Sequence, residues 1–175
     1  MAVIINGDAG VTTTSGAQYN SLQRGTAASP AIGSSIEFAI PSWARRITLI
    51  LAGASTTGSA TCIVRLGTAS GVVTSGYVGG ITVAGSSVST ANNTSGIGGF
   101  STSAGATTVT GQFVISNVSG NIWVSNGMVY RNGETSSSYS NGFLDLGVSP
   151  LTSVALVVSG FFGAFDAGTV NVICE

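Results

Sequence analysis

Apolar and polar residues alternate in short runs along most of this chain. In Ile36–Ile40 the residues Ile, Phe and Ile occupy every second position, which is the period of a strand with one buried face. Gly, Ser, Asn and Thr clusters separate such runs at the spacing of a sandwich or barrel. The further strand-forming runs are Ile47–Ala52, Thr61–Leu66, Tyr77–Ala84, Thr107–Ile115, Asn121–Val124, Met128–Tyr130, Thr152–Ser159 and Thr169–Cys174. We therefore predict an all-β domain over residues 34–175, an antiparallel β-sandwich of jelly-roll type.

The first 33 residues differ from the rest. Val3-Ile4-Ile5 is followed by turn-forming residues and then by Val11–Thr14, which predicts a short β-hairpin. A hairpin of this size is not stable alone, so we expect the apolar strip of Val3, Ile4, Ile5 and Val11 to be buried against the main domain or a neighbouring copy. Gly16–Arg24 is the best candidate for a helix, and Gly25–Ser35 is predicted to be a flexible linker. Residues 1–33 are thus expected to form an arm for attachment and oligomerisation.

Composition excludes several kinds of chemistry. Gly, Ser and Thr make up 72 of 175 residues, only 11 residues are charged, and the chain contains no histidine and no lysine. Without histidine, the usual general base and every Ser-His or Cys-His nucleophile pair are missing. Cys62 and Cys174 are too far apart in sequence for a metal or redox motif and are expected to be free, buried thiols. We therefore predict no catalytic residues, no metal site and no cofactor.

Charge and segment lengths limit the partners. A net charge of −1 does not suit binding to the phosphate backbone of nucleic acid. The longest apolar segment, Val154–Phe165, is interrupted by Ser and Gly and is shorter than the ~20 residues that span a bilayer. No signal peptide is evident at the N-terminus. We expect synthesis in the cytoplasm, no membrane insertion and no nucleic-acid partner.

Two polar stretches are candidate binding loops. Gly85–Gly105 is predicted to be a long connection or an irregular edge strand, and Arg131–Gly142 is the most polar stretch of the chain. Neutral binding surfaces use amphipathic aromatic residues among short hydroxyl and amide side chains. The predicted binding residues are therefore Arg131, Glu134, Tyr139 and Asn141, whereas Trp123 and Tyr130 are assigned to the core. The alternative is that Arg131–Gly142 is simply a solvated hairpin loop.

Several residues have a predicted structural role. Pro41 should end the strand Ile36–Ile40, and Trp43 should cover the edge of the core. Arg45 and Arg46 either lie in a solvated turn or pair with a carboxylate of another subunit, such as Glu37 or Glu175. Asp166-Ala167-Gly168 predicts a structural turn, in which Asp166 accepts backbone N–H groups and Gly168 adopts a positive φ.

Four patches of the chain form an ordered set of motifs: Ile40-Pro41-Ser42-Trp43-Ala44-Arg45-Arg46-Ile47-Thr48, then Val64-Arg65-Leu66-Gly67 with Thr74-Ser75-Gly76-Tyr77, and finally the C-terminal run from Phe165 to Glu175. Together they resemble a β-rich module found at the C-terminal ends of tailed-bacteriophage fibre and appendage proteins. The segment Ile5–Thr13 is similar to the openings of phage fibre proteins. Arg65 and Cys174 depart from the family, which usually has a glutamine and an aromatic residue there. The resemblance implies a virion structural protein that is oligomeric and often trimeric.

Three functions follow as hypotheses. The first is a virion fibre or appendage component that presents loops to a bacterial surface glycan, as a homotrimer joined to other virion proteins through its arm. The second is a purely structural capsid decoration or head-fibre protein. The third is a polysaccharide-cleaving appendage, for which Glu134 and Asp145 would be the carboxylate pair.

Overall fold

Three antiparallel sheets make up the part of the chain that the computed structural model describes. The backbone is described for residues 3–6, 10–13 and 18–19, and backbone and side chains are described for residues 22–29, 33–102, 107–159 and 163–175. No helix occurs in these ranges, so the prediction of an all-β sandwich is confirmed. The strands are β1 Val3–Asn6, β2 Gly10–Thr13, β3 Gln18–Tyr19, β4 Gln23–Arg24, β5 Ser35–Ala39, β6 Arg46–Thr56, β7 Ala60–Thr68, β8 Gly71–Val72, β9 Val78–Ala84, β10 Val88–Asn92, β11 Gly98–Thr102, β12 Thr108–Ser119, β13 Ile122–Asn132, β14 Ser136–Asp145, β15 Ser153–Ser159 and β16 Phe165–Cys174.

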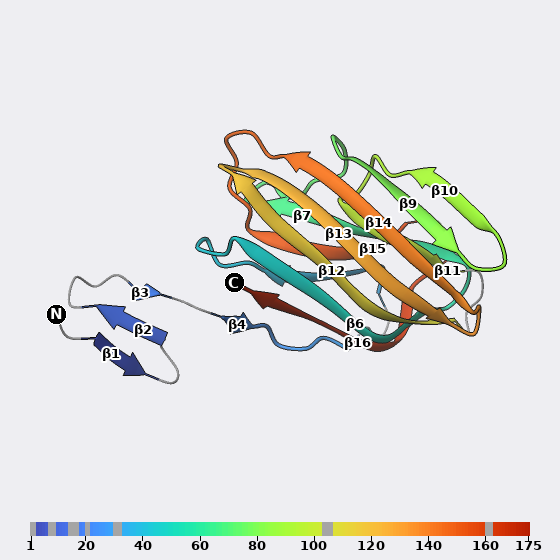
Figure 1. Ribbon diagram of the computed structural model, residues 1–175, viewed down its shortest axis with the longest axis horizontal. Helices are drawn as coiled ribbons and strands as arrows, with labels where there is room; N and C mark the ends of the chain where they lie inside the picture. Colours follow the sequence, from blue (N-terminus) through green and yellow to red (C-terminus); the bar gives the residue numbers. More distant parts are fainter. Residues whose placement is uncertain are drawn as a thin grey trace.

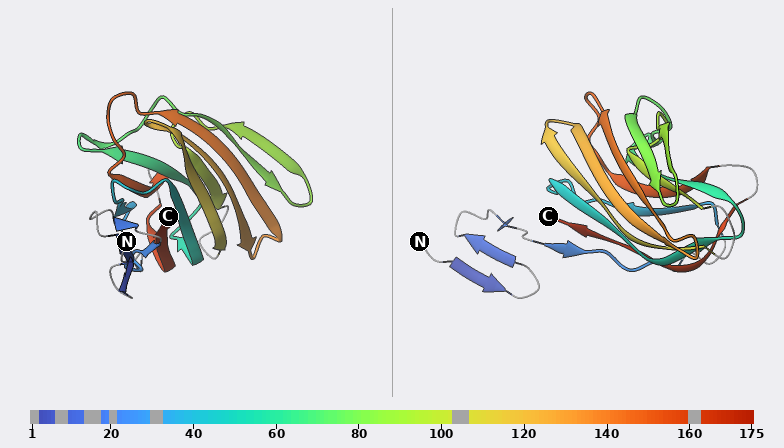
Figure 2. Two further views of the ribbon diagram at one scale, coloured as in Figure 1. Left: turned by 60° about the vertical axis from the view of Figure 1, so that its left-hand side comes forward. Right: turned by 45° about the vertical axis from the view of Figure 1, so that its right-hand side comes forward.

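Two of the sheets form the sandwich (Figures 1 and 2). The larger sheet has the order β10-β9-β14-β13-β12-β6-β16-β4, and the smaller has the order β11-β7-β15-β5, with β8 paired to β7. Their facing sides share one hydrophobic core, to which both sheets contribute. The largest fully buried side chains are Phe100, Phe113, Phe165, Ile47, Leu49, Leu51, Leu66, Ile97, Ile115 and Leu156. Burying this apolar surface is the main favourable contribution to folding.

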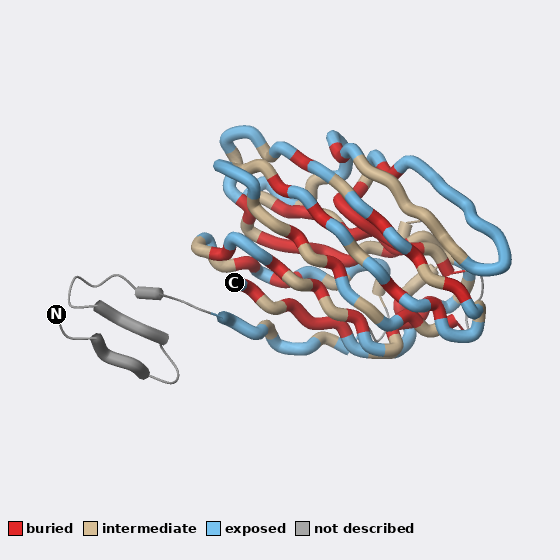
Figure 3. The backbone as a smooth tube through the Cα atoms, in the orientation of Figure 1, coloured by how far each residue is buried: buried red, intermediate tan, exposed pale blue. Residues whose placement is uncertain are grey.

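The central strands of the larger sheet, such as β13 and β14, have one buried and one exposed side (Figure 3). In β13, Trp123, Ser125 and Val129 are buried, whereas the residues between them face solvent or are partly covered. The same alternation runs through β14, where positions 136, 138, 140 and 144 are buried. Because side chains alternate along a strand, the residues between the buried ones share the outer face of the sheet.

Small residues close the sandwich along β11. The inward positions of β14 include Ser138 and Ser140 rather than large apolar residues, and Ser140 Oγ accepts a hydrogen bond from Gly99 N at 3.2 Å. A Cβ at Gly142 would lie only 2.1 Å from Ile97 O. Ser125 Oγ also donates to that carbonyl oxygen. The lack of larger side chains lets β11 approach the larger sheet closely. The hydrogen bonds of Ser125 and Ser140 then hold β13 and β14 in place.

A bulge, rather than a turn, contains Asp166-Ala167-Gly168. This stretch lies inside β16, where the pairing with β6 shifts register on both sides of Ala167. The predicted positive φ of Gly168 is confirmed at +95°. Asp166, however, accepts a hydrogen bond from the Ser55 hydroxyl, where backbone N–H donors were predicted. The prediction of a turn is thus wrong, because residues with turn chemistry also form bulges within a strand pair.

The N-terminal segment is also β-structured where it is described. β1 pairs with β2 in the register Ile5↔Val11, which confirms the predicted hairpin, and β3 pairs with β2. The predicted helix over Gly16–Arg24 is wrong, since β3 and β4 occupy its described residues. The predicted oligomerisation residues Val3, Ile4, Ile5 and Val11 lie in β1 and β2, and their side chains are outside the described part.

The segment after β4 is not a free linker. Gly25 N donates to Val172 O, and Ala28 and Val170 form a bridge along the edge of β16. Gly33 forms a second bridge with Phe165. Short polar residues in Gly25–Ser35 predict a flexible linker, but backbone groups of this segment pair with the edge of β16.

The predicted roles of Pro41, Trp43 and the two cysteines are confirmed, whereas the pairing of Arg46 differs. β5 ends before Pro41, and Trp43 packs partly buried against the core. Arg46 Nε lies 3.7 Å from Glu175 Oε2, so the arginine pairs with the C-terminal residue of its own chain, where a pair between subunits was considered. Cys62 and Cys174 are free and buried, as predicted.

Candidate functional site

The stretch Arg131–Gly142 is not a loop. Arg131 lies near the end of β13, a short turn follows, and residues from Ser136 onward form β14. The loop prediction is wrong because serines at alternate positions look like loop composition but here face inward against β11. The structure therefore separates the four predicted binding residues into two pairs.

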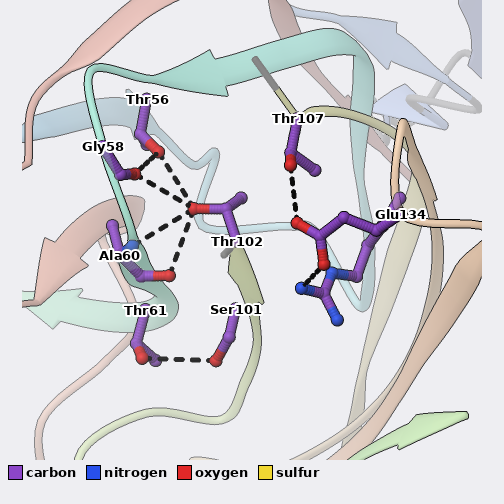
Figure 4. A network of polar contacts seen from close by, with 9 residues as sticks. Thr56, Gly58, Ala60, Thr61, Ser101, Thr102, Thr107 and Glu134 are labelled. Carbon is purple, nitrogen blue, oxygen red and sulfur yellow. Dashed lines mark hydrogen bonds and ion pairs between the residues drawn. The ribbon is translucent and has the colours of Figure 1, made fainter. Parts of the chain in front are cut away.

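Arg131 and Glu134 form a mostly buried ion pair at one end of the sandwich (Figure 4). Arg131 Nη2 forms a charge-assisted hydrogen bond with Glu134 Oε2, and the two side chains are 6% and 16% exposed. The other carboxylate oxygen of Glu134 accepts a hydrogen bond of 2.5 Å from Thr107 Oγ1. The pair is held across the β13–β14 turn, where Thr135 has a positive φ of 46°. These two residues are not presented to an external partner.

A hydroxyl network lies beside this ion pair (Figure 4). Thr102 Oγ1 lies 3.0 Å from Thr56 Oγ1 and accepts a hydrogen bond of 3.2 Å from Ala60 N. Thr56 Oγ1 also donates to Gly58 O at 2.8 Å. The network joins the β6–β7 connection to the end of β11. We assign a structural role to this end of the molecule, because its polar groups form hydrogen bonds with one another.

Tyr139 and Asn141 lie on the outer face of the larger sheet. The register places Tyr139 opposite Met128 and Asn141 opposite Asn126 on β13. Tyr130 was predicted to be core but is 47% exposed, whereas Trp123 is buried at 4% exposure as predicted. We call Asn126, Met128, Tyr130, Tyr139, Asn141 and Phe143 the aromatic–amide face. Three aromatic rings, a thioether and two amides thus lie on one side of two paired strands.

A groove lies beside the aromatic–amide face. It has a volume of about 660 Å³, a size typical of ligand sites, and it is mainly apolar. The outward residues of β6, β12 and β13 line it: Ile50, Ala52, Thr110, Gln112, Val114, Asn126 and Met128. Asn126 and Met128 therefore belong both to the groove and to the aromatic–amide face, so the two form one continuous surface.

This surface carries no charge. The sequence has no Asp, Glu, Lys or Arg between Arg65 and Arg131, a range that includes all of β9 to β12 and most of β13. In β14 the outward positions 137, 139, 141 and 143 are also neutral. The next outward position, Asp145, is exposed and charged, so it marks the margin of the neutral surface beyond Phe143. A partner that needs ionic contacts would find none on the aromatic–amide face.

The predicted second loop, Gly85–Gly105, contains two strands where it is described. β10 is an edge strand, as in one of the two forms expected, but its register with β9 is regular where an irregular edge is predicted. β11 is a buried strand of the smaller sheet. A second hollow of about 380 Å³ lies between the β9–β10 hairpin and β7. Its lining is neutral and rich in hydroxyl and amide groups, including Thr61, Asn93 and Ser101.

Glu134 and Asp145 do not form a hydrolytic pair. Glu134 precedes β14 and Asp145 ends it, so the rise of ~3.3 Å per strand residue separates them by about 30 Å. Glycosidases hold their two carboxyl groups within about 10 Å of each other. Across the described ranges, no group of three or more His, Cys, Asp or Glu residues could hold a metal ion. Burial raises the pKa of the Cys62 thiol to about 12, which makes it a poor nucleophile.

Comparison with known proteins adds no family assignment. No protein-family model matches this chain, and no curated protein is significantly similar to it. No helix long and apolar enough to cross a membrane occurs among the described residues. The resemblance to phage fibre modules therefore stays a prediction from sequence motifs.

Sequence reasoning missed four members of the aromatic–amide face: Asn126, Met128, Tyr130 and Phe143. A usable signal was present. From Trp123 to Arg131, small or apolar inward residues alternate with outward Asn126, Met128 and Tyr130. Reading this run as one strand of period two would have placed Tyr130 on the opposite side from Val129.

Proposed function

We propose that this protein is a structural component of a bacteriophage virion, a fibre or appendage subunit that attaches to a neutral glycan on a bacterial surface. The motifs described above support the virion assignment by resemblance. The observation that carries attachment is the aromatic–amide face, which is exposed, uncharged and continuous with a groove. The proposal moves the binding surface from loops to the outer side of β12, β13 and β14.

The chemistry of the face suits a sugar. A pyranose ring has apolar C–H faces, which stack on aromatic rings, and hydroxyl edges, which need groups that both donate and accept hydrogen bonds. Tyr and Phe provide the rings, and the Asn126 and Asn141 amides each donate and accept. Paired strands lie ~4.8 Å apart and residues on one face repeat every ~6.7 Å. Rings and amides are therefore spaced closely enough to contact one sugar unit together.

Neutrality narrows the class of glycan. A charged sugar or a phosphate would lose hydration on this face without gaining an opposite charge, which is unfavourable. An uncharged polysaccharide loses little by the transfer. We infer neutral hexose-type repeats as the ligand class, rather than acidic capsules or phosphate-bearing polymers.

The remaining partners follow from the same proposal. The N-terminal arm, with Val3, Ile4, Ile5 and Val11, joins three copies and connects them to other virion proteins. Trimerisation would present three faces together and raise the apparent affinity for a repetitive polymer. Localisation in the virion after synthesis in the host cytoplasm belongs to this proposal.

The test compares adsorption of purified protein variants to bacteria. Replacing Tyr130 and Tyr139 together by Ala should reduce adsorption at least tenfold, because exposed aromatic residues often dominate binding energy. Val148→Ala is a matched control, since Val148 is 97% exposed but lies on the β14–β15 loop, away from the face. Equal adsorption of all three folded proteins would contradict attachment through the aromatic–amide face.

A purely structural decoration protein is the second candidate. It is favoured by the polar end of the sandwich, where Arg131, Glu134 and the threonine network are directed inward. Virions without the protein would then keep their adsorption rate but lose physical stability. Loss of adsorption on deletion, with unchanged particle stability, would exclude this role.

A further inference from the structure

The strand β10 forms one margin of the larger sheet and has no neighbour on its outer side within the described chain (Figures 1 and 3). All five of its residues, Val88–Asn92, are exposed. It pairs with β9 in an unbroken register, from Val88↔Ala84 to Asn92↔Gly80. A regular edge of this length offers a row of backbone N–H and C=O groups to a further strand.

The common protective features of edge strands are missing from β10. Its sequence, Val-Ser-Thr-Ala-Asn, contains no charge and no proline, and its register with β9 shows no bulge. The margins of the two sandwich sheets differ in this respect. β5 carries Glu37 at its centre, β11 is mostly buried, and β4 has only two residues. Among these margins, β10 alone combines five residues, a regular register and no charge with exposure of every residue.

Hydrogen bonds at both ends of the hairpin show which groups of β10 point outward. Gly85 N donates to Ser87 O, and Asn93 N donates to Gly79 O, so positions 87 and 93 lie in hydrogen-bonded pairs with β9. In an antiparallel pair, hydrogen-bonded and non-hydrogen-bonded positions alternate. The N–H and C=O groups of Val88, Thr90 and Asn92 are therefore directed away from β9.

We propose that β10 pairs with β10 of a second copy, antiparallel and centred on Thr90. A two-fold contact uses the same patch on both copies, so a strand can complement itself without another partner. In this register Thr90 lies opposite its own copy and Val88 lies opposite Asn92. All three outward positions then exchange hydrogen bonds, and Thr-Thr is a favourable cross-strand pair. Absence of charge favours this occupant, since a charge at position 90 would face its own copy.

The pairing would join two larger sheets into one continuous sheet. Tyr139, Thr82 and Thr90 are cross-strand neighbours on the outer face. Two copies of Tyr139 would thus stand five strand spacings apart, about 24 Å. The pairing itself rests on β10 and not on the glycan proposal, so either can fail alone.

Site-specific crosslinking of the full chain tests the register. Cα atoms of a hydrogen-bonded antiparallel pair lie ~5.5 Å apart, within the range that a disulfide spans. Thr90→Cys should form a covalent dimer under mild oxidation. In the same register two Val88 residues are about 13 Å apart, so Val88→Cys should crosslink at most one tenth as much. Cys62 and Cys174 are buried and give little background.

A mass measurement provides the second readout. Thr90→Lys places like charges directly opposite each other and should at least halve the assembly mass in light scattering at hundreds of micromolar, whatever the arm contributes. Thr74→Lys is the matched control, because Thr74 is an exposed threonine outside the strands. Equal crosslinking of Thr90→Cys and Val88→Cys, or equal masses for both Lys variants and the parent protein, would overturn the proposal.

Discussion

The buried ion pair of Arg131 and Glu134 allows a quantitative test of the roles assigned to the predicted binding residues. Only 6% of the Arg131 side chain and 16% of the Glu134 side chain are exposed. Removing one partner of a buried pair leaves an uncompensated charge, which costs about 3–5 kcal/mol. Glu134→Gln should therefore lower the free energy of unfolding by about 3 kcal/mol, although glutamine has nearly the same shape.

The double variant distinguishes the pair from two independent residues. Replacing Arg131 by Met removes the buried guanidinium, so adding Glu134→Gln should then cost much less. We expect a coupling energy of at least about 1.5 kcal/mol from the four-protein cycle. Urea unfolding followed by tryptophan fluorescence provides the measurement, since the buried indole of Trp123 and the partly buried indole of Trp43 become exposed. All proteins must be compared at one concentration, because self-association adds to apparent stability.

The opposite result is equally clear. If Arg131 and Glu134 serve an external ligand, the free energy of unfolding of each single variant should lie within about 1 kcal/mol of that of the parent protein. The effects of the two substitutions should then be additive. Adsorption to bacteria would then fall in folded protein. That outcome would restore the sequence-based binding assignment of these two residues.

Of four further predictions, two concern the thiols, one concerns the bulge in β16 and one concerns the N-terminal arm. Burial raises the pKa of Cys62 from 9.0 to about 12, so the unfolded chain ionises first at this thiol. Between those pH values Cys62 should lower the free energy of unfolding by about 1.4 kcal/mol per pH unit, and Cys62→Ala should remove this part of the alkaline loss. Reductant should not change the melting temperature, because Cys62 and Cys174 form no disulfide. Gly168→Ala should destabilise by more than about 2 kcal/mol, since its Cβ would lie 2.4 Å from Gly53 O, whereas Gly120→Ala meets nothing within 4 Å and should cost about 1 kcal/mol. At low micromolar concentration, well below the hundreds of micromolar used to detect β10 pairing, light scattering should show a trimer for the full chain and a smaller species for a chain starting at Ser34. A full-length monomer would contradict the role of the arm.

Strand periodicity predicted the fold class because alternating apolar and polar residues in the sequence correspond to alternating buried and exposed positions in the strands. Ile36–Ile40 and Thr61–Leu66 each correspond to a strand, and Pro41 ends the first as its lack of an N–H requires. The close approach of β11 to the larger sheet could not be predicted in this way. It depends on Ser and Gly inside β14, which are typical of loops in sequence but here make room for another strand.

The candidate site was predicted in part. Tyr139 and Asn141 were selected for their chemistry and lie on the exposed face, whereas Arg131 was selected for its charge and is buried. Charge usually indicates exposure, but an arginine three residues before a glutamate across a tight turn can satisfy that charge internally. Sequence alone does not give the pairing that brings Met128 next to Tyr139, because their partnership depends on strand register.

Titration of the protein with neutral bacterial polysaccharides, read by amide and methyl NMR shifts, tests attachment through the aromatic–amide face. We expect saturable shifts at Asn126, Met128, Tyr130, Tyr139 and Asn141, and their loss in the Tyr130→Ala, Tyr139→Ala double variant. Shifts confined to the other sheet or to the end loops, or binding unchanged in that folded double variant, would contradict it.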